Sequence, residues 1–261
     1  YLNRFLSGAL TPGSTFKIIT STAAIENLPD IHDTTFDCQQ TKTVAGEKIT
    51  CIGYHGNVGI KRAFETSCNI AFADIAMELG ANQMTSCANK LGFNKNFSID
   101  GITLAKSIYD VNDATEASIG WSGVGQYNDL VNPAHMMIIN GAIANGGTPI
   151  QPYMIKHMTS SLGIKSHVGT TKKEAEMMTE STASQVSDLM RSAVKNNYGN
   201  SMFGNLEVCA KTGTAEVSND KSKKPHSWMV GFSKDIDCPL AFVVVVENGG
   251  SGIEVAGSIA S

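Results

Sequence analysis

The sequence predicts a mixed α/β fold of the α+β type, in which helices flank an antiparallel sheet and a mostly helical subdomain is attached. Three strand-like segments follow one another late in the chain, at 206–213, 227–233 and 240–247, and short connections between successive strands favour antiparallel pairing. The region from about residue 26 to 131 is instead rich in helix caps and small residues. With 261 residues, 42% of them hydrophobic, the chain can bury a full core.

The first expected helix begins at Pro12-Gly13-Ser14. The residues from Phe16 to Ile25 are largely apolar, which is typical of a buried helix. Ser14 then lies in the first turn, near the positive end of the helix dipole.

Two further helices are expected at 61–66 and 70–79. Apolar residues recur on one face of the second segment, and Gly80 closes it. Ser67 and Asn69 lie at the junction between the two helices. By residue type alone they are capping residues.

The second half of the chain predicts a helix at 133–144, stopped by Gly146-Gly147, a strand at 150–158 and a helix at 182–195. The lysine-rich segment 218–225 is expected to be a solvated hairpin loop. We expect a single domain over 1–261. Its sheet-containing part is formed by 1–25 and 132–261, and its helical subdomain by 26–131.

Ser14 and Lys17 form a candidate nucleophile and base. A serine hydroxyl is a poor nucleophile at neutral pH and needs a base beside it. Residues three apart on a helix lie on the same face. Lys17 must lose its proton to act as the base, which burial and a nearby positive charge, for which Lys211 is the natural candidate, both promote. On its own, Ser-x-x-Lys is also typical of a capped helix with a surface lysine.

The segment from Lys211 to Thr214 ends the first late strand. Lys211 offers a fixed positive charge, Thr212 and Thr214 offer hydroxyls, and Gly213 allows another chain or a substrate to approach the backbone closely. A peptide that ends in a free carboxylate would suit this row. A plain edge strand with a bulge is the alternative interpretation.

Three motifs occur in a fixed order: Ser14-Thr15-Phe16-Lys17, Ser67-Cys68-Asn69 and Lys211-Thr212-Gly213-Thr214. Together they match the signature set of penicillin-interacting serine enzymes. The chain therefore resembles the transpeptidase domain of penicillin-binding proteins. Gly125-Gln126, Asn132-Pro133 and the segment 226–232 are similar to further landmarks of that family.

The resemblance implies a serine D-Ala-D-Ala transpeptidase that crosslinks peptidoglycan stem peptides through an acyl-enzyme on Ser14. It implies that Lys17 is the base, that Ser67 relays protons to the leaving amine, and that Asn69 binds a substrate amide. Lys211, Thr212, Gly213 and Thr214 would bind substrate. The backbone N–H groups of Ser14 and Thr214 would form the oxyanion hole. β-Lactams would acylate the same serine.

Three other functions share these motifs. A carboxypeptidase transfers the acyl group to water, and a penicillin-recognising sensor is acylated without turning over. A β-lactamase needs a deacylating base, often a Glu followed four residues later by Asn. Glu78 and Asn82 have that spacing but lie at the end of a helix, and Glu116 is followed by Gly120. Thr214-Ala215-Glu216 is more similar to penicillin-binding proteins.

The six cysteines leave three states open: unpaired thiols, one disulfide, or a metal site. Cys38, Cys51 and His55 have a spacing loosely similar to that of a zinc site, with Asp37 or Cys68 as the fourth ligand. Cys209 and Cys238 are expected to be small core residues. No cofactor is expected apart from this structural zinc.

Net charge and hydropathy restrict the partners. A net charge of −4 does not favour binding to nucleic acid or to an anionic membrane. No stretch reaches the roughly 18–20 apolar residues that span a bilayer. The resemblance implies the outer face of the bacterial cytoplasmic membrane, cell-wall synthesis partners, and a membrane tether in the full-length protein. It also implies upstream strands and a fuller C-terminal helix, so we expect a fragment.

Overall fold

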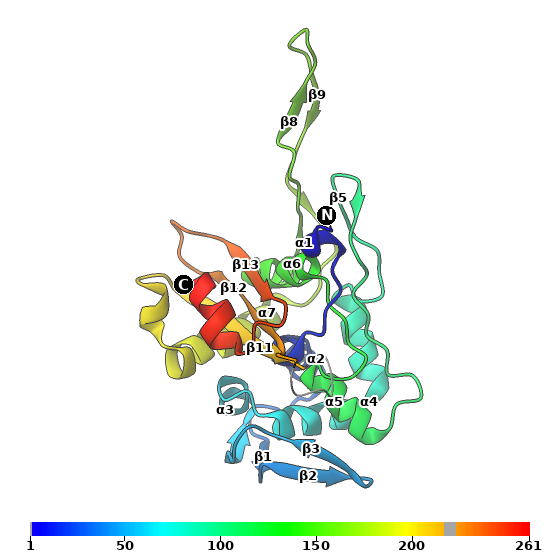
Figure 1. Ribbon diagram of the computed structural model, residues 1–261, viewed down its shortest axis with the longest axis vertical. Helices are drawn as coiled ribbons and strands as arrows, with labels where there is room; N and C mark the ends of the chain where they lie inside the picture. The colour runs from blue at the N-terminus through cyan, green and yellow to red at the C-terminus, as the bar shows by residue number, and fades with distance from the viewer. Residues whose placement is uncertain (1, 217–222) are drawn as a thin grey trace.

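A three-stranded antiparallel sheet forms the centre of the structure, a computed structural model that describes residues 2–216 and 223–261. The strands lie in the order β11-β12-β13 (Figure 1), with bounds Val208–Ala215, His226–Ser233 and Ala241–Val246. Lys211 pairs with Val230, which pairs with Val243. The antiparallel sheet is therefore confirmed. The solvated loop predicted at 218–225 falls mostly on residues outside those described.

Alternation along the strands gives the sheet two different faces. One face joins the main core, where Trp228, Val230 and Phe232 pack with the helices α6 and α7. The other face has a smaller apolar cluster, under the C-terminal turns Gly252–Gly257 and Ser258–Ala260. Because both faces are covered, every residue of β12 is buried.

The helix that carries Ser14 and Lys17 is largely buried. It consists of a 3₁₀ turn, η1 (Gly13–Phe16), followed by α2 (Lys17–Asn27). It packs against α4, α5 and α7. The remaining principal helices are α3 (Ile60–Glu65), α4 (Asn69–Lys90), α5 (Glu116–Val124), α6 (Pro133–Ala144) and α7 (Glu180–Ala193).

Residues 26–131, predicted as a mostly helical subdomain, hold short strands that the sequence analysis did not predict. The region also contains β1 to β4, which form two antiparallel pairs, β1 with β4 and β2 with β3. Their bounds are Thr35–Cys38, Thr41–Val44, Glu47–Thr50 and Gly56–Gly59, and a shorter pair, β5 and β6, spans Ser98–Ile99 and Ile102–Thr103. Such four-residue strands are too short for periodicity to reveal them.

Of two other predicted boundaries, one is confirmed and one was wrong. The helix predicted at 70–79 ends at Gly80, whose backbone is not helical (φ 71°, ψ 169°), and a further helical segment continues beyond this kink to Lys90, where Met84, Cys87 and Ala88 are buried in the core. The strand predicted at 150–158 is two pieces, β7 (Ile150–Gln151) and β8 (His157–Thr159). Pro152 separates them, since it lacks a backbone donor.

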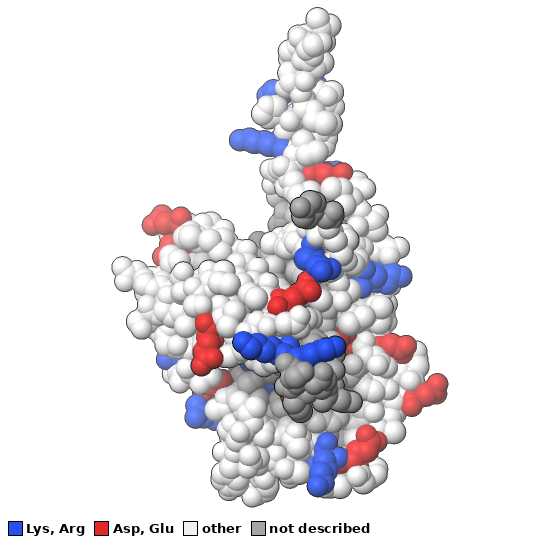
Figure 2. Space-filling view, viewed as in Figure 1, with Lys and Arg blue, Asp and Glu red and all other residues white. Residues whose placement is uncertain are grey.

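The pieces β7 and β8 belong to an arm that projects from the body (Figure 1). β7 pairs with β10 (Lys172–Lys173), and β8 pairs with β9 (Lys165–Val168). On the face shown in Figure 2, basic and acidic side chains are interspersed. Within the described part of the chain, no helix has the length and apolarity needed to cross a membrane.

Asn132 ties the N-terminal segment to α6. Its Nδ2 donates to the carbonyls of Phe5, Leu6 and Gly8 at 3.2, 2.9 and 2.8 Å. Its Oδ1 accepts the N–H of His135 at 3.1 Å and so caps the helix. The side chain is fully buried, so this amide uses both its donor and its acceptor.

Asn132→Asp keeps the capping oxygen but places a second carboxylate oxygen against three carbonyls. We expect the free energy of unfolding to fall by about 3–5 kcal/mol, because a buried charge is left unpaired. Urea denaturation measures this loss. The matched variant Asn145→Asp changes an exposed amide that donates to Thr148 and should lose less than about 1 kcal/mol. Equal losses would contradict this role of Asn132.

Candidate active site

Ser14 lies on the η1 turn, which the end of β11 crosses closely. A Cβ at Gly213 would lie 2.8 Å from the Pro12 carbonyl oxygen, and one at Gly125 would lie 2.2 Å from that of Gly13. Both contacts are too short, so glycine is required where these backbones meet. Gly213 was predicted to let another chain segment or a substrate approach its backbone closely. In the structure the segment that approaches it is the η1 turn. Ser14 is half-buried, so its hydroxyl remains accessible from one side.

The Lys17 amine lies at the centre of the first two motifs. Its Nζ is 3.1 Å from Ser14 Oγ and 3.0 Å from Ser67 Oγ. It also lies 2.7 Å from the Ser67 carbonyl oxygen and 2.8 Å from Asn69 Oδ1. The orientation of the Asn69 amide is fixed because its Nδ2 donates to the Thr50 carbonyl at 3.0 Å. The lysine is fully buried.

These four contacts match a neutral amine. The Ser67 carbonyl and Asn69 Oδ1 can only accept, so they take both N–H groups of a neutral lysine. The nitrogen lone pair is then left for a serine hydroxyl, which can donate. An ammonium would instead present three N–H groups and no acceptor. The hydrogen-bond inventory thus leaves Lys17 able to receive a proton from Ser14.

Burial and a neighbouring charge act in the same direction. Burial lowers the pKa of Lys17 well below 10.5, and the charge of Lys211 lowers it further. Negative charge on Cys51 and Cys68 raises the pKa of Lys17, but more weakly. The base role that the sequence predicts for Lys17 is therefore compatible with its surroundings.

Ser67 connects the two lysines. Its Oγ is 3.0 Å from Lys17 Nζ and 3.0 Å from Lys211 Nζ. Its backbone is left-handed, with a φ of 54°, a conformation that is unfavourable for a residue with a Cβ. This conformation lets both its carbonyl and its hydroxyl face Lys17. Two ammonium groups on one hydroxyl repel each other, which favours a state in which only one of the two lysines is charged.

Lys211 is held from the other side. Its Nζ donates to the Thr212 carbonyl at 3.1 Å and to Tyr198 Oη at 3.4 Å, and it lies 5.7 Å from the centre of the Phe64 ring. Burial lowers its pKa to about 7. The pKa of Lys17 is lowered by burial and by the charge of Lys211 together, so the two lysines oppose each other's protonation.

The two threonines of the third motif are already hydrogen-bonded. Thr212 Oγ1 donates to Tyr198 Oη at 3.2 Å, and Thr214 Oγ1 accepts the N–H of Gly252 at 3.1 Å. Thr214 is exposed and keeps its own hydroxyl hydrogen for a ligand. Substrate binding by Thr212, and an oxyanion hole at the Ser14 and Thr214 N–H groups, stay predictions.

Sequence reasoning missed Tyr198 and Glu65. Tyr198 lies in a π-helical turn, Val194–Tyr198, after α7, and its hydroxyl also accepts the N–H of Thr212 at 3.2 Å. Glu65 accepts from Asn196 Nδ2 at 2.7 Å and from the Ser192 hydroxyl, which fixes the end of α3 to α7. An aromatic residue before Gly199 was the only signal for Tyr198.

Four thiol and imidazole groups gather beside the Ser67 segment. We call Cys38, Cys51, His55 and Cys68 the cysteine–histidine cluster; their ligand atoms all lie within 4.8 Å of one another. The sequence left Asp37 and Cys68 as alternatives for the fourth ligand, and in the structure Cys68 is the one that lies in the cluster. Asp37 instead accepts from Gln39 at the surface. All six cysteines have free thiols.

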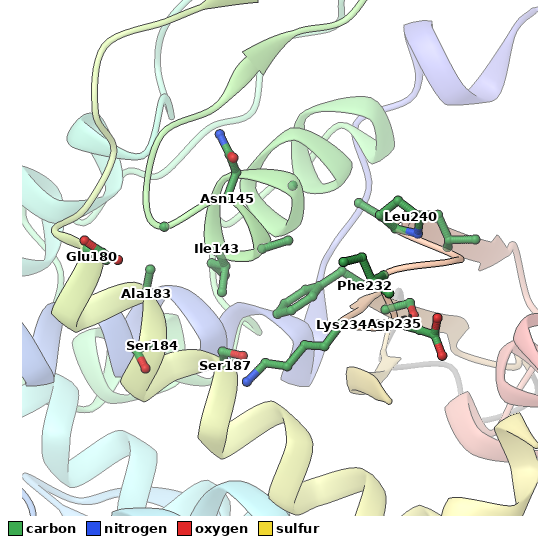
Figure 3. A pocket seen from close by; sticks show the side chains of 17 residues that line it. Ile143, Asn145, Glu180, Ala183, Ser184, Ser187, Phe232, Lys234, Asp235 and Leu240 are labelled. Carbon is green, nitrogen blue, oxygen red and sulfur yellow. Dashed lines mark hydrogen bonds between the residues drawn. The ribbon is translucent and has the colours of Figure 1, made fainter. Parts of the chain in front are cut away.

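A separate hollow lies away from this site. It measures about 820 Å³ and lies between α6, α7 and the β12–β13 turn (Figure 3). Lys234 and Ser187 point toward each other across it, near Phe232. Among the described residues that line it there is none of the predicted site.

The family model of the penicillin-binding protein transpeptidase domain matches residues 1–261. The chain therefore belongs to this family, and the resemblance read from the motifs is confirmed.

Similar proteins include the peptidoglycan D,D-transpeptidase PbpA of Mycolicibacterium smegmatis, 27% identical over 98% of this chain and 53% of that protein. Stage V sporulation protein D of Bacillus subtilis is 27% identical over 96% of this chain and 40% of its own length. The chain thus spans about half the length of the first of these relatives.

Solved structures give the same result. The D,D-transpeptidase domain of a peptidoglycan glycosyltransferase from Eggerthella lenta superposes with a TM-score of 0.90 at 25% identity, over 98% of this chain and 65% of that one. Penicillin-binding protein A of Mycobacterium tuberculosis, as a penicillin G acyl-enzyme, gives a TM-score of 0.86 at 26% identity, over 95% and 57%. The predicted fold class is confirmed.

Tyr198→Phe should slow acylation of Ser14 by a β-lactam about tenfold. The change removes the acceptor for Thr212 and the partner of Lys211, each contact contributing on the order of 1 kcal/mol. Stopped-flow acylation with a fluorescent penicillin measures the rate. Tyr127→Phe, at an exposed position, is the control. An unchanged rate in Tyr198→Phe would show that Lys211 needs no support from the π-helical turn.

Proposed function

We propose that the chain is the catalytic domain of a D,D-transpeptidase that crosslinks peptidoglycan stem peptides through an acyl-enzyme on Ser14. The observation that carries the proposal is the buried amine of Lys17, 3.1 Å from Ser14 Oγ, with its donors directed to two obligate acceptors. The names of the similar proteins support the same class of reaction.

The proposed acylation begins when Ser14 Oγ attacks the carbonyl carbon between the two terminal D-Ala residues. Its proton passes to the lone pair of Lys17 as the C–O bond forms. Ser67, bonded to both lysines, then relays a proton to the leaving nitrogen, the C–N bond breaks, and the last D-Ala departs. In the second half, the amine of a neighbouring stem peptide attacks the ester and releases Ser14.

Substrate recognition is assigned to the third motif. Lys211 supplies the cation that pairs with the terminal carboxylate of the donor peptide. Binding of that carboxylate raises the pKa of Lys211, which burial lowers in the free protein. Asn69 is bonded to Lys17 and to Thr50, so its amide is more firmly placed as a support of the base than as a free substrate ligand. Thr214, exposed at the strand end, is the available hydroxyl.

The alternatives are a carboxypeptidase, a β-lactamase and a penicillin sensor. Against a β-lactamase, Glu78 and Asn82 are exposed on α4, and Glu116 is exposed at the start of α5. We propose that β-lactams remain bound as slowly hydrolysed acyl-enzymes. We also propose an extracytoplasmic location, a membrane tether in the full-length protein, and partners in cell-wall synthesis.

Ser14→Ala should abolish covalent labelling by penicillin and leave the fold intact, because the variant loses only one half-buried hydroxyl. Intact-mass spectrometry after exposure to the drug measures the adduct, and circular dichroism controls for folding. A full adduct on the variant would rule out Ser14. Adding a stem-peptide donor with an amine acceptor then separates the functions: a crosslinked product supports transpeptidation, whereas hydrolysis alone indicates a carboxypeptidase.

Lys17→Arg should lose acylation almost as completely as Lys17→Ala, because arginine cannot give up its proton. In the wild type, the neutral amine is the active form, so the acylation rate should rise with pH through the lowered pKa of Lys17 and level off well below 10.5. Rates measured across this pH range test both statements. An arginine variant within about threefold of wild type would contradict the base role.

Lys211→Ala should leave the donor carboxylate poorly paired, at a cost of about 2–4 kcal/mol in the transition state. This corresponds to a loss of roughly thirty- to a thousandfold in acylation efficiency. The loss should be smaller for a donor whose C-terminal carboxylate is amidated. If both donors slowed equally, Lys211 would act on Lys17 and Ser67 instead of on the carboxylate.

A further inference from the structure

The cysteine–histidine cluster is assembled from three separate segments. Cys38 ends β1, Cys51 and His55 lie in the loop between β3 and β4, and Cys68 caps α4. The three cysteines are buried, with exposed fractions of 0%, 7% and 0%. Backbone bonds bring the segments together, from Cys51 N to the Gln40 carbonyl at 2.8 Å and from His55 N to the Cys38 carbonyl at 3.3 Å.

The spacing of the ligand atoms is that of a metal centre. Zinc binds thiolate sulfur at about 2.3 Å and imidazole nitrogen at about 2.0–2.1 Å, so a regular tetrahedron separates sulfur from nitrogen by about 3.5 Å. His55 Nδ1 lies 3.5 Å from Cys38 Sγ and 3.5 Å from Cys51 Sγ. Four donors, three sulfurs and one nitrogen, complete the coordination.

The surroundings of the sulfurs are those of bound thiolates. The N–H of Asn69 points at Cys51 Sγ at 3.3 Å, and the N–H of Ala71 points at Cys68 Sγ at 3.5 Å. Such outer hydrogen bonds orient the ligands and support their negative charge. Three thiolates and one Zn²⁺ ion have a net charge of −1. The positive N-terminus of α4, at Cys68, stabilises this negative charge.

We propose that Cys38, Cys51, His55 and Cys68 bind one Zn²⁺ ion in a closed tetrahedral site that fixes Ser67 and Asn69 in their positions beside Lys17. With four protein ligands, the site has no open position for water or substrate, so its role is structural. Thiolate and imidazole donors select zinc over the hard cations Mg²⁺ and Ca²⁺.

The connection to the reacting groups is short. Cys68 lies between Ser67 and Asn69, so a metal bond to its sulfur restrains the backbone on both sides. Ser67 keeps its unfavourable φ of 54°, and Asn69 is held through its N–H to Cys51 and its Nδ2 to Thr50. Two-stranded pairs such as β1–β4 are marginally stable alone, and the ion would fasten them to α4. This role rests on the proposed function, whereas metal binding does not.

The first experiment measures zinc in the purified protein by mass spectrometry of the metal. We expect about one ion per chain in the wild type, and less than about 0.1 in Cys38→Ser and in His55→Ala. Cys209→Ser, at another buried thiol, is the matched control and should retain the full amount. Replacing zinc by Co²⁺ in the wild type should give the intense visible bands of tetrahedral, thiolate-bound cobalt, a result that does not depend on whether any variant folds.

The second experiment tests the positioning of Ser67 and Asn69. Chelation of zinc from the wild type should slow acylation by a fluorescent penicillin at least about tenfold, and added Zn²⁺ should restore it. The Ser14 adduct in the zinc-loaded protein is measured in parallel. Absence of that adduct would reject the proposed function and leave the zinc site standing.

Three results would overturn the inference, two of them the metal site and one its positioning role. Less than about 0.1 zinc per chain after purification with added Zn²⁺, with no cobalt spectrum, would reject the metal site. A disulfide among Cys38, Cys51 and Cys68, found by counting free thiols in the denatured, unreduced protein, would reject it as well. Zinc that binds fully but whose removal leaves acylation unchanged would reject the positioning role.

Discussion

The site depends on one constraint, which is how the fully buried Lys17 amine satisfies its hydrogen bonds. Two of its four neighbours, the Ser67 carbonyl and Asn69 Oδ1, can only accept. A neutral amine fits this set with its lone pair facing Ser14, whereas burial penalises the ammonium. The proposed activation of Ser14 therefore depends on where these two acceptors lie, and the rest of the structure keeps them there.

Three parts of the fold hold these acceptors. The crossing of β11 over η1, possible because Gly213 lacks a Cβ, sets the distance between Ser14 and the sheet, and Gly125 after α5 allows an equally close approach to Gly13. Glu65 ties the end of α3 to α7 through Ser192 and Asn196. The cysteine–histidine cluster contacts Asn69, whose N–H points at Cys51 Sγ at 3.3 Å. A strained Ser67 backbone (φ 54°) persists because its surroundings determine it.

The sequence predicted those elements that a motif or a regular spacing of apolar residues marks. Three late apolar runs predicted the sheet, and Asn132-Pro133 predicted the start of α6. It could not predict β1 to β4, because four-residue strands carry too little periodicity. It placed the end of the second helix correctly at Gly80, where the backbone leaves the helical conformation, but it did not predict the helical segment that follows this kink.

For the site, residue types and their order identified five candidate catalytic residues, Ser14, Lys17, Ser67, Asn69 and Lys211, and the tertiary structure shows that they lie together. Tyr198 was missed because its role depends on a π-helical turn that places its hydroxyl against Thr212 and Lys211. Cys68 could not be chosen over Asp37 from spacing alone, since the choice depends on which side chain faces inward at the α4 cap.

The most direct measurement is the protonation of Lys17, followed by NMR of lysines labelled at the ε position, with Lys17→Arg assigning the resonance. If Lys17 is a buried neutral amine, its resonance titrates well below 10.5. The pKa of Lys17 is then lower in the wild type than in Lys211→Ala, because the variant lacks the neighbouring positive charge. If Lys17 titrated together with the exposed lysines, near about 10.4, the central claim would be contradicted.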